Sequence, residues 1–332
     1  MFENLRKKSL VKTYNDPRYS INFEQGHVIY LNLLSFAQHK QRLSKKKVED
    51  KSFPSTFDGV SKEFRLIANT LKDVQFNMIY CPSGTFIMGH ESEQNKPTEK
   101  DKENPPRLET IKKPFLLGET DVIQELYLKV MGVDPSIFQF DESRPEPQYP
   151  VECVSWYDAI DFCNKLSALQ GLEKCYLLTD ITIGLTGLRI GEKGILSANV
   201  SWNENANGYR LPTEMEWEYA AKAGTENKWV GTNDYDKIPK YGFYPFNHPK
   251  QKKVEEYAQP IKKKKPNAWG FYDMGGNIHE WCWDKLNTSE TEDVSSNRVL
   301  RGSEMLTSNR GAADPRAKTQ GFGFRIARSI FG

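Results

Sequence analysis

The pattern of apolar and polar positions predicts two capped helices. After Ser155, apolar residues recur on one helical stripe, and Asp158 stands three positions on, where a capping box needs it. Thr213 and Glu216 repeat this box, and Gly224 is placed to end the second helix. We therefore expect helices that begin after Ser155 and after Thr213. The first stripe would bury Trp156, Ala159, Ile160, Cys163 and Leu166, which places Cys163 in the core rather than in a catalytic site.

Shorter apolar runs predict several strands and one more helix. Residues 76–80 and 82–89 predict two strands joined by a Pro-Ser-Gly turn, that is, a hairpin. Residues 115–122 predict a strand followed by a turn, and residues 124–131 predict a short helix. The remaining expectations are an exposed loop at 90–104, short strands with an Asn-rich turn at 176–209, and a polar, loop-rich stretch at 225–265.

Residues 1–74 predict a partly helical, basic appendage to one larger domain at 75–332. One helix face would carry Leu31, Leu34 and Ala37, and a second would carry Phe64, Ile67, Ala68 and Leu71. The charged run 45–51 predicts a linker between them. The first 51 residues hold eleven Lys and Arg against five Asp and Glu, although the whole chain has a net charge of only +2. A solvated arm explains this excess, with contact to a membrane or nucleic acid as the alternative.

The composition is that of a globular protein, with 38% hydrophobic and 12% aromatic residues. No apolar run approaches the roughly 18 residues that a membrane span needs, and residues 28–38 lack the layout of a signal peptide. The expectation is an intracellular protein, with the cell surface as the alternative if a leader has been removed. The four lysines at 262–265 lack interleaved aromatic residues, so we expect no nucleic-acid partner.

No catalytic constellation can be assembled from the titratable residues. The five cysteines, at 81, 153, 163, 175 and 282, form no CxxC motif and no clear disulfide framework, so we expect mostly buried thiols. The five histidines stand singly, and His279-Glu280 is not followed by the second histidine of a zinc motif. Neither a phosphate-binding Walker loop nor a Gly-x-Ser-x-Gly elbow is present.

Six stretches in one order carry a family resemblance. They are 82–89 (PSGTFIMG), 150–159 (PVECVSWYDA), 209–221 (YRLPTEMEWEYAA), 267–283 (NAWGFYDMGGNIHEWCW), 298–302 (RVLRG) and 323–325 (GFR). Together they resemble the formylglycine-generating-enzyme/sulfatase-modifying family, a variant of the C-type lectin fold, over roughly residues 76–328. The resemblance implies an α+β fold with little regular secondary structure, short antiparallel strands and two packed helices.

The resemblance does not extend to the oxidase chemistry of that family. Its oxidase members carry two cysteines between an Arg-Gly-Gly-Ser-like turn and the final Gly-Phe-Arg, whereas residues 304–320 of this chain contain no cysteine. Without a thiolate pair there is neither a soft site for Cu(I) nor a thiol nucleophile. We therefore expect a non-enzyme, with a family enzyme whose active site is atypical or lost as the alternative.

The remaining branch of the family consists of binding proteins, and the chain resembles its retroelement-diversified variable proteins. These display mutable side chains on a fixed backbone near the C-terminus, here at about 284–325. The turn at Arg301-Gly302-Ser303 lacks the family's second Gly and its Trp. Adenine replacement in Asn codons cannot yield Lys, Glu, Gln, Met or Trp, and residues 306–314 contain none of these five. Glu304 and Met305 do not fit that pattern.

The resemblance implies a ligand-binding patch on an exposed loop, in a receptor or an adhesin-like protein whose ligand is another protein or a surface structure. An ordinary loop without a ligand is the alternative. The candidate ligand-binding residues are Lys285, Asn287, Glu304, Met305, Leu306, Ser308, Arg310, Ala312, Asp314 and Arg316.

A structural calcium ion is a separate implication of the resemblance, because the Gly-Asn-x-x-Glu-Trp turn of family members can supply oxygen ligands to this cation. Here Asn277 and Glu280 keep both oxygen donors. The alternative is that the two side chains bond to neighbouring backbone. No other cofactor is expected. Arg301 and Arg325 are expected to form buried hydrogen bonds that hold the framework.

Overall fold

The computed structural model describes six stretches of the chain, together with the backbone of two short strands, β1 (Ile21–Glu24) and β2 (Val28–Leu31). The six stretches are residues 66–89, 105–138, 148–186, 193–243, 258–286 and 297–330. They form a mixed α+β structure in which short antiparallel strands outweigh the helices, as the sequence predicts.

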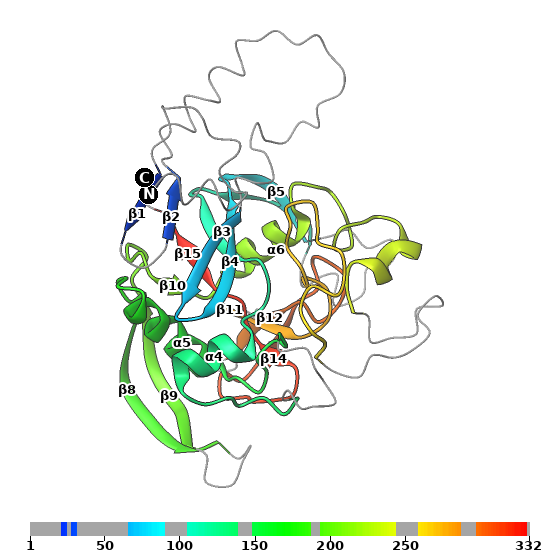
Figure 1. Ribbon diagram of the computed structural model, residues 1–332. Helices are drawn as coiled ribbons and strands as arrows, with labels where there is room; N and C mark the ends of the chain where they lie inside the picture. Colours follow the sequence, from blue (N-terminus) through cyan, green and yellow to red (C-terminus); the bar gives the residue numbers. More distant parts are fainter. Residues whose placement is uncertain are drawn as a thin grey trace.

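The largest sheet has five antiparallel strands in the order β10-β15-β7-β4-β3 (Figure 1). Its final strand along the chain, β15, lies between β10 and β7, so the C-terminal end of the domain is built into this sheet. The strands are β3 (Leu66–Leu71), β4 (Val74–Cys81), β7 (Phe115–Gly118), β10 (Tyr209–Arg210) and β15 (Ala327–Ser329).

A second sheet is built entirely from the C-terminal part of the chain, in the order β13-β12-β11-β14. β14 runs parallel to β11, and the other pairs are antiparallel. Its strands are β11 (His279–Lys285), β12 (Arg298–Arg301), β13 (Gly311–Ala313) and β14 (Phe322–Gly323). β13 is therefore an outer strand, with one edge turned away from the sheet.

The remaining strands pair in twos. β5 (Gly84–Met88) pairs with β6 (Arg107–Ile111), and β1 pairs with β2. β8 (Tyr176–Leu185) and β9 (Lys193–Trp202) form a long hairpin that extends away from the body of the domain (Figure 1).

Both predicted capping boxes are present. Ser155 and Asp158 cap α5 (Trp156–Leu169), and Thr213 and Glu216 cap α6 (Glu214–Lys222). Ala223, in the left-handed conformation, caps the C-terminal end of α6, and Gly224 follows with a φ of 70°. The predicted short helix is α4 (Gln124–Met131), and a 3₁₀ helix, η2, covers Tyr235–Lys240.

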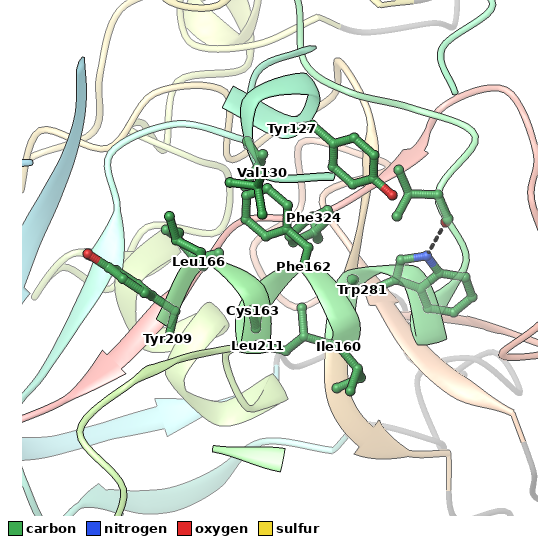
Figure 2. Close-up of a cluster of buried hydrophobic side chains, with 14 of the residues drawn as sticks. Tyr127, Val130, Ile160, Phe162, Cys163, Leu166, Tyr209, Leu211, Trp281 and Phe324 are labelled. Carbon is green, nitrogen blue, oxygen red and sulfur yellow. Dashed lines mark hydrogen bonds between the residues drawn. The ribbon is translucent and has the colours of Figure 1, made fainter. Parts of the chain in front are cut away.

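Two buried clusters hold these elements together. The first packs α4 and α5 against the sheets, with Tyr127 stacked on Phe162 and Phe324 at the edge of both rings (Figure 2). In the same cluster the Trp281 Nε1–H donates to the Val154 carbonyl at 2.8 Å. The second cluster surrounds α6 and contains Trp217 and Cys282. Cys163 lies in the first cluster, as predicted.

Three sequence-based expectations are wrong. Residues from Leu66 onward form strand β3 rather than a helix, because this short apolar run pairs along β4 from Leu66–Ile79 to Leu71–Val74. β4 and β5 do not form a hairpin with each other: β4 pairs with β3 and β7, whereas β5 pairs with β6. Residues 176–202 form one hairpin of ten-residue strands rather than several short strands.

Other expectations reach beyond the described residues. Leu31 ends strand β2, but Leu34, Ala37, the linker at 45–51 and nearly all of the loop at 90–104 lie outside them. The boundary at residue 75 stays a prediction, although β3 already belongs to the domain's sheet. Among the described helices, none has the length and apolar character that crossing a membrane requires.

Candidate ligand-binding surface

The candidate segment, residues 303–320, connects β12 to β14 and contains the outer strand β13. It has little regular structure of its own. Its position therefore depends on contacts with α6 and with the loop at 228–230.

Arg301 is the main anchor beneath this segment. Its guanidinium is fully buried and donates to Glu218 Oε2 at 2.6 Å and to Glu214 Oε1 at 3.3 Å, which ties β12 to α6. The same group donates to the carbonyls of Thr307 at 2.7 Å and Ser308 at 3.2 Å. Because these acceptors are backbone atoms, Arg301 fixes the path of the segment without depending on the displayed side chains.

The other side of the segment is fixed by backbone pairing. The Val230 amide donates to the Met305 carbonyl at 2.9 Å, and the Thr307 amide donates to the Lys228 carbonyl at 3.0 Å. The Met305 side chain then fills a space beside Gly242 and Gly275, where a Cβ on either glycine would overlap with its sulfur. The Met305 side chain thus anchors the segment in the second buried cluster.

The structure places the predicted ligand-binding residues in three groups. Met305 and Ser308 are buried, with 1% and 2% exposure, so the expectation that they line an exposed patch needs correction. The Met305 side chain packs into the second buried cluster, and the backbone carbonyl of Ser308 accepts a hydrogen bond from Arg301. Asn287 lies outside the described residues. The others reach the surface wholly or in part: Lys285, Glu304, Leu306, Arg310, Ala312, Asp314 and Arg316.

Three of these surface residues, Arg310, Asp314 and Arg316, are engaged in ion pairs. Arg310 lies 3.0 Å from Glu214, so its guanidinium reinforces the contact between the segment and α6. Arg316 donates to both Asp314 oxygens, and this contact lowers the pKa of the Asp314 carboxyl. An exposed pair of this kind contributes little to stability and can be exchanged for other side chains.

A second arginine, Arg325, holds the framework behind the surface. Its guanidinium is fully buried, donates to Glu280 Oε1 at 2.7 Å and to the Gly118 carbonyl at 3.1 Å, and lies 3.6 Å from Asp121. Burial, and secondarily the Glu280 carboxylate, raise the pKa of Asp121 well above its ordinary value. Burial also raises the pKa of Asp273 to about 6.

The two residues implied for calcium have other partners. Trp217 Nε1–H donates to Glu280 at 2.8 Å, and Arg325 neutralises the same carboxylate. The Asn277 amide oxygen accepts from the Gln259 amide at 2.7 Å. No group of three His, Cys, Asp or Glu suited to a metal occurs among the described residues. This donor set does not fit a hard cation, because its one carboxylate is already paired, so no calcium chemistry follows from it.

All five cysteines are buried, and none of them forms a disulfide bond. Burial raises the pKa of the Cys163, Cys175 and Cys282 thiols, so these groups stay protonated near neutral pH. A buried neutral thiol is a poor nucleophile and a poor metal ligand.

Two features of this region escape prediction from the sequence. Arg298 stacks 3.8 Å from the centroid of Trp156 and donates to the Trp283 carbonyl, and burial lowers its pKa to about 10. Trp229 forms an isolated β-bridge with Leu306. No spacing signal marks either contact, because the partners are far apart in the sequence. The density of tryptophan was the only available hint.

Comparison with known proteins identifies relatives in both sequence and fold. The family model of the sulfatase-modifying factor enzyme 1-like domain matches residues 63–330. A solved structure, Treponema denticola variable protein 1, is 33% identical and superimposes with a TM-score of 0.65 over 79% of this chain and 98% of its own.

Two relatives of different description also match. The chaperone protein LppX of Paenibacillus barcinonensis is 35% identical over 58% of this chain and 70% of its own length. The inactive C-alpha-formylglycine-generating enzyme 2 of Bos taurus is 26% identical over 73% of this chain and 80% of its own. With the variable protein, they confirm the predicted α+β fold of the formylglycine-generating-enzyme type, and the chain belongs to the sulfatase-modifying factor enzyme 1-like family.

Proposed function

We propose that this protein is a non-enzymatic binding protein that displays a sequence-diversified patch on a lectin-like scaffold. One observation carries the proposal. The backbone of residues 305–308 is fixed by Arg301 from one side and by the loop at 228–230 from the other, through bonds to backbone atoms. Side chains at Glu304 and Leu306 can therefore change while the path of the chain is kept. Ala312 and Asp314 lie within and directly after β13, whose backbone is held by its pairing with β12.

The likeness to a protein described as variable supports this proposal. The ligand would be a protein or a cell-surface structure. The patch itself consists of the surface members of the predicted set, and Met305 and Ser308 act as fixed supports beneath it.

The genomic neighbourhood tests the diversification. We expect an imperfect repeat of codons about 284–325 within a few kilobases, differing from the gene at adenines, together with a reverse-transcriptase gene. Differences at the codons of Leu306, Ala312 and Asp314 would assign these positions as variable. If neither a repeat nor a reverse transcriptase is found, the diversification is refuted and the fold alone remains.

The alternative, a sulfatase-modifying enzyme with a relocated active site, has its own test. Purified protein incubated with Cu(I) and a Cys-containing sulfatase peptide should form no aldehyde detectable by hydrazide labelling. Clear turnover would contradict a purely binding role.

A chaperone-like role is a second candidate, favoured by one observation. The β8 strand of the protruding hairpin leaves four apolar side chains 48–65% exposed, and one relative is described as a chaperone. The four are Leu177, Ile181, Ile183 and Leu185. If this hairpin holds non-native chains, the protein should suppress the aggregation of reduced insulin, and Leu177→Ser with Ile183→Thr should abolish the effect. Suppression that survives both substitutions would exclude the hairpin as the binding surface.

A further inference from the structure

The loop at 228–235 lies against the candidate segment although it is distant in the sequence. Trp229 bridges Leu306 in an antiparallel arrangement, flanked by the backbone bonds of Val230 to Met305 and of Thr307 to Lys228. These contacts form a short two-stranded ribbon, with one strand from each segment. Any ligand that covers Leu306 therefore also approaches Trp229.

This loop presents aromatic side chains. Trp229 is half-buried against the second cluster, and Tyr235 is 48% exposed. Their rings meet edge to face, with centroids 5.8 Å apart. The Lys228 ammonium stands 5.0 Å from the centroid of the Trp229 ring.

The loop is held by its own side chains as well as by the segment. The Lys228 amide donates to Asn233 Oδ1 at 2.6 Å, and the Asp234 amide donates to Thr232 Oγ1 at 2.9 Å. The Asp236 amide then donates to Asp234 Oδ1 at 3.0 Å, so Asp234 caps η2, whose first residue is Tyr235. The aromatic pair is thus held in place before any ligand arrives, which lowers the entropy that binding would cost.

We propose that Trp229 and Tyr235 are a constant aromatic anchor of the ligand patch, and that the ligand bound there is a folded protein. The proposal rests on the function proposed above and adds to it the residues that do not vary. The diversified side chains would choose the ligand, whereas the anchor would supply a similar share of affinity to every ligand. Trp and Tyr are the residues most enriched among those that dominate protein–protein affinity.

The surroundings of the anchor favour a protein over a glycan. Leu306 extends the aromatic pair into an apolar centre, and Lys228 and the Lys237–Asp234 ion pair provide charged groups around it. An apolar centre with a polar rim is the usual anatomy of a protein–protein interface. A sugar ring would stack on an open indole face, but the Lys228 ammonium occupies one face of Trp229.

A display library tests the anchor without knowledge of the natural ligand. The full chain would be displayed on yeast with the codons of Glu304, Leu306, Ala312 and Asp314 randomised, and binders would be selected against three folded probes: lysozyme, ribonuclease A and a β-lactamase. Each selected clone would then receive Trp229→Ala, Trp229→Phe, Tyr235→Ala or the control Leu169→Ala. Leu169 is a suitable control because it is apolar, 51% exposed and located at the end of α5.

In most clones we expect Trp229→Ala to weaken binding about 30-fold and Tyr235→Ala about 10-fold, which are typical losses for interface anchors. Trp229→Phe should retain most of the affinity, and Leu169→Ala should change it less than twofold. Tyr235→Ala keeps the test valid if Trp229→Ala lowers the displayed amount of folded protein, because Tyr235 lies largely at the surface.

Three outcomes would overturn the inference. If binders lose affinity when the randomised codons are reverted but change less than threefold with both alanine substitutions, the anchor is refuted and the proposed function stands. If no binders emerge, or reversion has no effect, the proposed function fails and the anchor with it. If the unmodified protein binds a glycan array in a Trp229-dependent manner, the protein ligand is refuted.

Discussion

Arg325 and Arg301 are both fully buried, and each is paired with glutamate, yet they hold different parts of the molecule. Arg325 joins Glu280 in β11 to the Gly118 carbonyl of β7, so all of its main partners belong to the sheets. Arg301 joins α6 to the carbonyls of Thr307 and Ser308, which belong to the candidate segment. One buried arginine thus ties the sheets to each other, whereas the other ties the candidate segment to α6.

The largest effect is expected at the framework pair. Glu280→Gln would leave the Arg325 charge buried without its carboxylate, and should lower the free energy of unfolding by about 3–5 kcal/mol. Urea denaturation followed by tryptophan fluorescence measures this loss. Asp314→Asn, which breaks an exposed pair with Arg316, is the matched control and should leave the midpoint nearly unchanged. Equal shifts of the unfolding midpoint in Glu280→Gln and Asp314→Asn would contradict the distinction between a buried framework pair and an exposed surface pair.

A slightly smaller effect is expected at Arg301. Arg301→Met should cost about 3 kcal/mol, because Glu218 loses its buried partner and two loop carbonyls lose their donor. The loss should also free the segment, so limited proteolysis should cut within residues 303–310 faster than in the native protein. Glu280→Gln should not cause this preferential cleavage below its unfolding midpoint. An unchanged cleavage pattern in Arg301→Met would show that the loop at 228–230 is sufficient to hold the segment.

The buried carboxyls near Arg325 predict a pH dependence. The pKa of Asp273 is about 6 in the folded chain, above its ordinary value of 3.8. Between pH 4 and 6 the folded state therefore binds more protons at this site than the unfolded state, and this group's contribution to stability falls as pH rises. Asp273→Asn removes this pH-dependent contribution. The free energy of unfolding of the variant minus that of the native protein should therefore rise by roughly 2–3 kcal/mol from pH 4 to pH 7. Denaturation at several pH values measures it, and a constant difference would contradict the raised pKa.

The smallest effect is expected at the helix caps. Ser155→Ala and Thr213→Ala should each cost about 1 kcal/mol, because each removes the acceptor for one amide in the first turn. Thermal unfolding compares the two variants directly. Thr213→Ala should additionally weaken the support of the segment, since Glu214 and Glu218 on α6 hold Arg301. Faster cleavage within 303–310 in Ser155→Ala instead would contradict that link.

Local patterns explain which parts of the fold could be predicted. The capping boxes at Ser155 and Thr213 lie within four residues of sequence, and both helices were predicted with their N-terminal caps. The hairpin expected at 76–89 was wrong because the partners of β4 and β5 are set by pairings with β7 and β6, across long stretches of chain. The sequence indicated that these residues form strands, but it did not indicate which strands pair with each other.

The candidate site was predictable in outline only. The position of the segment follows from the motifs around Arg301 and Arg325. Which side chains point outward does not follow from them. Met305 is buried beside Gly242 and Gly275, and Ser308 is buried where its backbone carbonyl accepts from Arg301. The bridge between Trp229 and Leu306 likewise depends on the folded chain bringing distant residues together.

A deep mutational scan of residues 280–325 tests most directly whether surface positions tolerate substitution while the buried framework positions do not. All single substitutions would be displayed on yeast and sorted for resistance to protease, which reports folding without any ligand. The structure predicts that Glu304, Leu306, Ala312 and Asp314 accept most side chains, whereas Glu280, Arg301, Met305 and Arg325 accept almost none. Comparable intolerance at both sets would contradict a variable surface carried on a fixed framework.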